Sequence, residues 1–179
     1  MDTPKYALFE HERRFLVLDP PDLAGAPARL IEDIYFDCGR LRLRRVTHFD
    51  SSPTQLKLCK KYGSDDPVSG LIVNTYLSAE EYAALATLPG RPLRKRRYRM
   101  AYGDRGFGLD VFEGDLAGLM LSEAEATSAD AIRSLSFPPW AALEVTADPF
   151  FTGGNLAGVS ASELGQQLAA RRADLATRS

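Results

Sequence analysis

The sequence lacks long apolar runs, cysteines at metal-ligand spacing and a large net charge. No apolar run approaches the roughly 20 residues that a membrane-spanning helix needs, and we expect a soluble protein with no membrane partner. The two cysteines, Cys38 and Cys59, are not spaced as metal ligands, and no secretory signal precedes the first expected strand. These absences predict reduced thiols and a cytoplasmic location.

The small net charge counts against nucleic-acid binding. A formal charge of −2 results from 22 basic and 24 acidic residues, whereas a nucleic-acid binder normally has a basic surface. The basic stretch 94–97 lies inside an expected strand and has only Tyr98 as an aromatic neighbour, so it is a poor nucleic-acid patch. The charges are nevertheless clustered by segment, and such clusters suit a small polyanion.

Length and composition indicate one folded domain. Of the 179 residues, 45% are hydrophobic and 26% are charged, which is typical of a globular protein rather than a disordered one. A chain of this length builds one well-buried core and is short for two. We therefore expect a single domain over residues 1–179. The oligomeric state stays open, with a homodimer as one alternative.

Turn signals and residue alternation predict many short strands. The expected strands are residues 6–17, 30–37, 41–49, 55–62, 71–77, 95–102, 107–113, 119–126 and 142–146. Ser78 and Glu81 form a capping box at the start of one helix. A short helix is expected at 127–135, and Ser160 caps a longer one that runs to Ala176. The short connections favour an antiparallel barrel or strongly curled sheet with helices outside it.

Charged side chains recur at every second position in several of these strands. Glu10, Glu12 and Arg14 share one side of the first strand, because side chains alternate between the two faces of a strand. The same alternation returns in residues 40–44, 95–99 and 123–125. Such faces either meet water or line a charged cavity. For any one strand, the solvated side of a sheet is the simpler interpretation.

The apolar residues between these charges suggest where the charges point. Leu41 and Leu43 alternate with arginines, and Leu109 and Val111 flank Asp110. One solution places the apolar residues outward against helices and the charges in a wide, hydrated lumen. Because burying unpaired ions is costly, such a lumen must hold water, counter-ions or a ligand.

The two kinds of charge suit two parts of one ligand. Arginine and lysine bind phosphate oxygens, arginine through forked hydrogen bonds. The basic candidates are Arg14, Arg42, Arg44, Lys57, Lys95 and Arg97. Carboxylates suit hard divalent ions such as Mg²⁺. The acidic candidates are Glu10, Glu12, Asp110, Glu123, Glu125 and Glu144. Together they describe a site for a metal-chelated polyphosphate.

These motifs resemble the CYTH superfamily, also called triphosphate tunnel metalloenzymes, in which a Glu-x-Glu-x-Lys strand lies near the N-terminus. The corresponding segment here is Glu10-His11-Glu12-Arg13-Arg14. The resemblance continues in chain order through residues 41–44, 95–98, 109–119, 122–125 and 144–146. It implies an α+β fold, a closed eight-stranded antiparallel β-barrel with flanking helices. It also implies that the tunnel binds triphosphate together with Mg²⁺ or Mn²⁺.

The resemblance further implies a role for each candidate. The metal-side carboxylates would be Glu10, Glu12, Glu123 and Glu125. The phosphate ligands would be Arg42, Arg44, Lys57, Lys95 and Arg97. The catalytic set would be Glu10, Glu12, Arg14 and Asp110, with Asp110 orienting the cationic side chains or a metal-bound water. We prefer Lys57 to its neighbours Lys60, which alternation places on the opposite face, and Lys61.

Two positions depart from the family pattern. The motif lysine, sometimes assigned to water activation, is Arg14 here, and arginine stays protonated at any relevant pH. The strand before the first helix often contains a tunnel glutamate, whereas this chain has Val73-Asn74-Thr75-Tyr76. The metal site is therefore either altered or one glutamate short.

The sequence thus predicts divalent-metal-dependent hydrolysis of inorganic tripolyphosphate or a related triphosphate, with a small triphosphate-containing molecule as the substrate. Within the same fold, the alternatives are a class IV-type adenylate cyclase and a thiamine triphosphatase. An alternative from a different class is a non-catalytic polyphosphate- or nucleotide-binding protein, which Arg14 and the missing glutamate favour.

Overall fold

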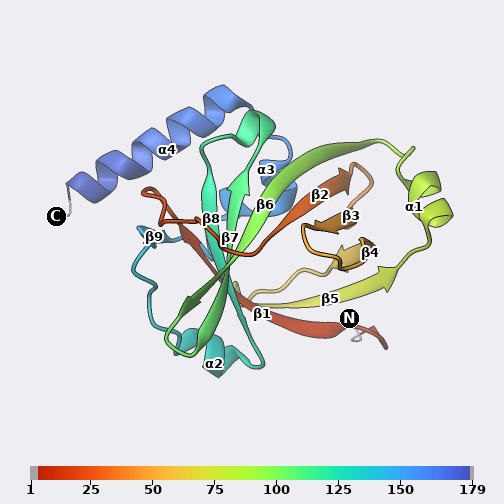
Figure 1. The fold of residues 1–179 in the computed structure, drawn as a ribbon, viewed down its shortest axis with the longest axis horizontal. Coiled ribbons are helices and arrows are strands. Elements are labelled where there is room, and N and C mark those ends of the chain that lie inside the picture. The colour runs from red at the N-terminus through yellow and green to blue at the C-terminus, as the bar shows by residue number, and fades with distance from the viewer. Residues whose placement is uncertain (1–3, 178–179) are drawn as a thin grey trace.

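A computed structural model describes residues 4–177 and contains a closed antiparallel β-barrel with helices outside it (Figure 1). The barrel strands are β1 (Leu8–Leu16), β2 (Ala28–Phe36), β3 (Leu41–His48), β4 (Gln55–Lys61), β5 (Ser69–Tyr76), β6 (Gly90–Tyr102), β7 (Arg105–Phe112) and β8 (Met120–Ala126). Their order is β5-β4-β3-β2-β6-β7-β8-β1, and β1 pairs back with β5 to close the barrel. The predicted eight-stranded barrel is confirmed.

Some element boundaries differ from the sequence-based expectation. Strand β6 begins at Gly90 rather than at residue 95, because its first half already pairs with β2. This tertiary pairing overrides the local turn signal of Pro89 and Gly90. The last expected strand shortens to β9, Leu143–Glu144. Three short helices were not expected: η1 (Gly114–Leu116), η2 (Pro149–Phe151) and α3 (Gly153–Leu156).

Strand β1 shares one of its edges between two partners. Its first half pairs with β5, and its last two residues pair with β9. Just after β9, the hydroxyl of Thr146 accepts a hydrogen bond from the backbone N–H of Arg14 at 2.9 Å. The chain that leaves β9 therefore starts at the barrel wall. It reaches one end of the barrel, where Phe151 and Leu156 are buried.

Helix α1 (Ala79–Leu85) covers part of the apolar outer face of the barrel (Figure 1). It begins at the Ser78 capping box, as predicted. Its buried Tyr82 packs in one cluster with Leu43 of β3, which is fully buried. Because side chains alternate along β3, the arginines on either side of Leu43 point into the barrel. The expected arrangement of outward leucines and inward charges is thus present on this strand.

Two further helices cover other parts of the barrel (Figure 1). Helix α2 (Ala129–Arg133) packs its buried Ile132 in one cluster with Phe15 on the outer face of β1. Helix α4 (Ala161–Ala176), close to the predicted range, packs Leu164 against the end of the barrel. Within residues 4–177, the helices fall short of the length and apolar content that crossing a membrane demands.

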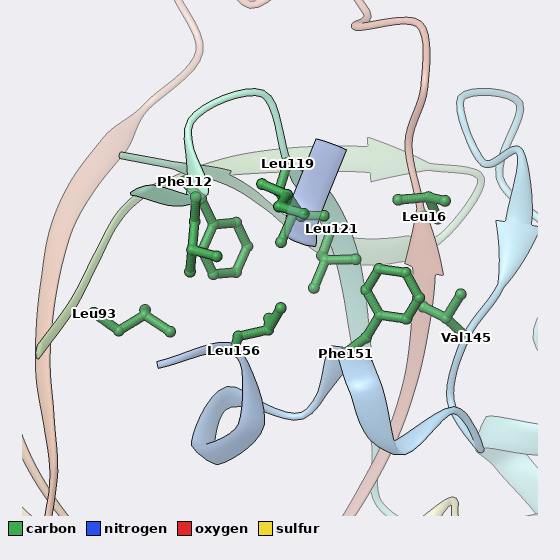
Figure 2. Packing of buried hydrophobic residues seen from close by; sticks show 10 residues of the cluster. Leu16, Leu93, Phe112, Leu119, Leu121, Val145, Phe151 and Leu156 are labelled. Atoms are coloured by element: carbon green, nitrogen blue, oxygen red, sulfur yellow. The ribbon is translucent and has the colours of Figure 1, made fainter. Parts of the chain in front are cut away.

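The largest apolar cluster closes one end of the barrel (Figure 2). Phe151 and Leu156 lie beside Leu121 of β8 and Phe112 of β7 in this cluster. The segment passes so close to β2 that a Cβ atom on Gly153 would lie 1.9 Å from the hydroxyl of Tyr35. A residue without a side chain is therefore required there. The segment after β9 is a stopper of the barrel end rather than a loose connection.

We expect Phe151→Ala to destabilise the fold by about 3–5 kcal/mol, because the buried ring is replaced by a cavity in the barrel end. Phe151 is 1% exposed. The free energy of unfolding from urea denaturation at pH 7 measures this loss. Phe49→Ala is the control, because Phe49 is 58% exposed and its removal should cost far less. Equal losses for the two variants would contradict the proposed packing.

Candidate functional site

A cavity of about 720 Å³ occupies the barrel interior next to the apolar stopper. Most of the predicted site residues line this cavity: Glu10, Glu12, Arg14, Arg42, Arg44, Lys95, Arg97, Glu123 and Glu125. They come from β1, β3, β6 and β8, which are far apart in the sequence. Two predicted residues, Lys57 and Asp110, are not among the lining residues. The barrel therefore brings acidic and basic side chains of separate strands to one enclosed space.

The pairing of β1 with β8 builds the acidic wall. Its register places Glu12 opposite Glu125 and Arg14 opposite Glu123. Burial raises the pKa of Glu125, and the nearby charges of Glu10, Glu12 and Glu123 raise it further, although Arg97 opposes them. Among residues 4–177, the Glu125 carboxylate has no hydrogen bond or ion pair. Glu125 is thus a crowded acidic group that a cation would relieve.

Arg14 is held by three acceptors at once. Its Nε donates to Glu123 at 3.0 Å, its Nη2 donates to Glu12 at 3.0 Å, and its Nη1 donates to the carbonyl of Phe151 at 3.1 Å. Burial alone would lower the pKa of Arg14, but the charges of Glu123 and Glu12 outweigh it and hold this pKa above its ordinary value. Arg14 therefore remains a cation that ties the acidic wall to the apolar stopper.

Lys61 is a site residue that the sequence-based prediction passed over. Its Nζ lies 2.5 Å from a carboxylate oxygen of Glu10 and 3.3 Å from one of Glu12, and it lines the cavity. Burial lowers the pKa of Lys61, but Glu12 and Glu10 raise it above its ordinary value overall. Lys57 is on the same face of β4. It lies opposite Arg44 in the strand register and over the ring of Tyr76. Side-chain alternation places both lysines on the inner face of β4. Only the stagger of the strands determines that Lys61, and not Lys57, reaches the acidic wall.

Asp110 anchors the basic wall from behind. It is fully buried, and its two oxygens accept from Nε and Nη2 of Arg97 at 2.6 Å each. Lys95 also donates to Asp110, and Arg97 reaches over β7 to donate to Glu123 of β8. Opposite Glu123 on β7, a Cβ atom on Gly108 would lie 3.0 Å from Cδ of Arg97. Asp110 and the small Gly108 together fix Arg97 against the wall.

Asp33 of β2 holds the arginines of β3 in place, as Asp110 holds Lys95 and Arg97 of β6. The sequence-based prediction did not include Asp33. Its oxygens accept from Nε and Nη2 of Arg44 at 2.7 Å each, and Nε of Arg42 lies 3.8 Å away. Burial raises the pKa of Asp33, but Arg44, then Arg42 and Lys95, hold it below its ordinary value. The hairpin turn after residue 36 places Asp33 opposite Arg44, and counting back from that predicted turn could have found the pair.

Arg42 has a buried N–H donor that is not hydrogen-bonded to any of the described residues. Its Nε is buried and has no hydrogen-bond partner, and the side chain is 14% exposed. A buried N–H group without a partner is destabilising by about 1–3 kcal/mol. Two further arginines outside the predicted set, Arg40 and Arg91, also line the cavity. The basic wall therefore offers donors that the protein itself does not use.

The acidic wall does not form a ready-made metal cage. Within residues 4–177, no three side chains of the His, Cys, Asp and Glu types are grouped as metal ligands. Glu10 and Glu12 are instead engaged by Lys61, and Glu12 and Glu123 by Arg14. The donor set still fits a hard divalent ion, because it consists of carboxylate oxygens crowded beside one another. A divalent ion would have to compete with Lys61 for this wall.

The sequence is similar to part of one characterised enzyme. No family model matches it. It is 44% identical over 69 residues to an inorganic triphosphatase of Nitrosomonas europaea. This alignment covers 38% of the chain and 46% of the relative, so the match spans less than half of that relative's length.

The barrel itself resembles solved structures more completely. The crystal structure of the inorganic triphosphatase NE1496 has a TM-score of 0.56 and 29% identity, with 83% of this chain and 93% of that chain covered. PH1819 from Pyrococcus horikoshii OT3 has a TM-score of 0.50 and 18% identity, with 69% and 82% covered, and shows the fold alone. The chain therefore shares its barrel with an inorganic triphosphatase.

Asp33→Asn should destabilise the protein by about 3–5 kcal/mol at pH 7, since Arg44 then stays buried without its counter-charge. The lowered pKa means that the Asp33 carboxylate stabilises the fold above its ordinary pKa of 3.8 and stops doing so as the pH falls through the folded-state value. The difference between wild type and variant should therefore shrink below pH 3.8 in urea unfolding. Asp37→Asn is the control, since Asp37 is 59% exposed, and a pH-independent difference would contradict the assignment.

Proposed function

We propose that this protein is a divalent-metal-dependent phosphoanhydride hydrolase of the CYTH type that acts on inorganic tripolyphosphate or a related triphosphate. The observation that carries the proposal is one cavity with a carboxylate wall facing an arginine and lysine wall. Such a pair of walls suits a chain of phosphoryl groups with its counter-ion. The likeness of both sequence and barrel to inorganic triphosphatases supports the same reading.

The basic wall would bind the phosphoryl oxygens. Arg42 has a buried Nε without a partner, and Arg44, Lys95 and Arg97 are held in place by Asp33 and Asp110. Arginine forks match phosphate oxygens, and cations held in fixed positions need no reorganisation when charge develops during phosphoryl transfer. Asp110 is thus a positioning residue in this proposal. It aims Lys95 and Arg97 and does not itself reach the cavity.

The acidic wall would hold the divalent ion. Glu10, Glu12 and Glu125 are the residues we assign to Mg²⁺ or Mn²⁺, since all three line the cavity on the same side. When bound, such an ion neutralises phosphoryl oxygens and lowers the pKa of a coordinated water. Glu123, the fourth predicted ligand, is held between Arg14 and Arg97, so it contributes chiefly by fixing those two arginines.

Arg14 does not act as a base in this proposal. Its guanidinium stays protonated and its donors are already taken by Glu123, Glu12 and Phe151. Phosphoryl transfer depends mainly on positioning and charge stabilisation rather than on a strong base. Hydrolysis is therefore compatible with arginine at this position.

A second candidate function is non-catalytic binding of polyphosphate or a nucleotide. The observation that favours it is the neutralisation of the acidic wall by Arg14 and Lys61, which a divalent ion must overcome. The position where relatives of this kind often have a tunnel glutamate is occupied by Asn74, opposite Cys59 on β4. Binding without turnover would identify this function.

Phosphate release from tripolyphosphate, ATP and thiamine triphosphate in the presence of Mg²⁺ or Mn²⁺ tests the proposal. We expect hydrolysis of tripolyphosphate that stops when the metal is chelated. Faster phosphate release from ATP or thiamine triphosphate than from tripolyphosphate would identify an organic triphosphate as the substrate. Tight binding of all three compounds with no phosphate release would instead support the non-catalytic binder.

Glu125→Gln should separate function from folding. Burial and the neighbouring carboxylates raise the pKa of Glu125, so at pH 7 its ionised form is less favourable in the folded protein than in the unfolded chain. The variant should therefore have an unchanged or slightly higher free energy of unfolding at pH 7. Metal-dependent turnover should fall about 100-fold or more. Glu32→Gln, which changes a carboxylate paired with Arg45, is the control and should keep its activity. A large loss of stability in Glu125→Gln would refute the crowded-acid assignment.

A further inference from the structure

Basic side chains also gather away from the cavity, toward the opposite ends of the strands. We call this group the basic barrel end and define it by Arg29, His48, Lys57 and Arg99. None of these four residues lines the cavity. On β6, Leu93 packs in the apolar cluster at the closed end of the barrel, whereas Arg99 lies near the other end of the same strand. The basic barrel end thus lies beyond the cavity lining and adjoins it at Arg44 and Arg97.

Strand register places Arg29 beside His48, and alternation puts Lys57 of β4 and Arg99 of β6 on the same inner face. Arg29 of β2 lies opposite His48 of β3 on one side and opposite Arg97 of β6 on the other. Lys57 of β4 lies opposite Arg44 of β3. Like charges directly opposite each other on neighbouring strands are destabilising. The barrel thus accepts a costly concentration of positive charge here.

This positive charge is not neutralised by the protein. Arg44 and Arg97 have carboxylate partners in Asp33 and Asp110. In contrast, within residues 4–177 the side chains of Arg29, Lys57 and Arg99 form no ion pair and no hydrogen bond. The Nζ of Lys57 lies over the ring of Tyr76, 5.3 Å from its centroid. Within the described residues, the exposed Arg29 and Arg99 and the half-buried Lys57 therefore have no carboxylate in an ion pair with them.

Burial, and then nearby positive charge, lowers the pKa of two of these cations. Burial lowers the pKa of Arg29, and Arg97 and Arg44 lower it further, against a smaller opposing effect of Asp110. Burial and Arg44 likewise lower the pKa of Lys57. The lowered pKa values mean that Arg29 and Lys57 each feel neighbouring positive charge. A bound anion would remove the repulsion.

His48 supplies an independent sign of a missing partner. Its Nε2 is buried and has no hydrogen-bond partner among residues 4–177, although His48 lies opposite Arg29 in the strand register. Buried polar atoms are nearly always hydrogen-bonded in native proteins. A ligand oxygen at this place would satisfy His48 and neutralise Arg29 together.

We propose that the basic barrel end is a second anion site, which binds a phosphoryl oxyanion between Arg29, His48, Lys57 and Arg99. Arginine forks favour phosphoryl oxygens over a monovalent halide. The anion has two sources, free orthophosphate and the far end of a linear polyphosphate longer than three units. The site goes beyond the proposed hydrolysis and does not depend on turnover.

Imidazole NMR of the full chain, ¹⁵N-labelled and kept metal-free with a chelator, tests this site. The chain has two histidines, and His11, whose Nδ1 lies 2.5 Å from the Ser69 hydroxyl, is the internal reference. Orthophosphate should shift the His48 resonances saturably and leave those of His11 in place. If orthophosphate has no effect and tetrapolyphosphate shifts His48, the source is the end of a longer chain. Both results support the site.

The double variant Arg29→Gln and Arg99→Gln should weaken this response at least about 10-fold. The matched control is Arg45→Gln with Arg96→Gln, which removes the same charge from the outer faces of β3 and β6, where these residues pair with Glu32 and Glu113. A His48 shift reproduced by sodium chloride at equal ionic strength, or unchanged in Arg29→Gln with Arg99→Gln, would overturn the proposal. Tripolyphosphate hydrolysis is measured separately, so loss of one property leaves the other standing.

Discussion

The pairing of buried charges is the constraint on which the barrel interior depends. Ionised groups can leave water only where an opposite charge and hydrogen bonds replace the solvent. Asp33 and Asp110, both almost fully buried, meet this condition for Arg44 and for Lys95 and Arg97. The two aspartates therefore allow a basic wall to exist inside an eight-stranded barrel. Without them, the arginines of β3 and β6 would have to turn outward, where the leucines are packed.

The apolar core lies outside and at one end of the barrel for the same reason. Leu43 packs under α1, Phe15 packs under α2, and Phe151 closes the end beside Phe112. An interior filled by apolar side chains would leave no space, whereas this arrangement leaves a cavity of about 720 Å³. The fold thus places its hydrophobic stabilisation where it does not compete with the site.

Strand alternation was sufficient to predict the inward set, since Glu12, Arg42 and Glu123 each face the cavity at the period expected for a strand. It could not distinguish Lys57 from Lys61, because both share one face of β4 and only barrel stagger decides which one reaches the acids. Nor could it find the stopper. The short helices around Phe151 have no periodicity of their own, and their position depends on the contact with Arg14. Long-range geometry, rather than local pattern, determines these features.

The acidic wall and the basic barrel end differ in how far the protein neutralises their charge. At the acidic wall, Arg14 and Lys61 already neutralise Glu12 and its neighbours, so a divalent ion must exchange one cation for another. In the proposed function, a divalent ion that arrives with phosphoryl oxygens would give the displaced Lys61 a new counter-charge. At the basic barrel end, the side chains of Arg29, Lys57 and Arg99 form no ion pair within the part of the chain that the structure describes. In the proposed function, this asymmetry would orient a metal-bound phosphoryl chain, with its metal toward Glu10 and its uncomplexed oxygens toward the arginines.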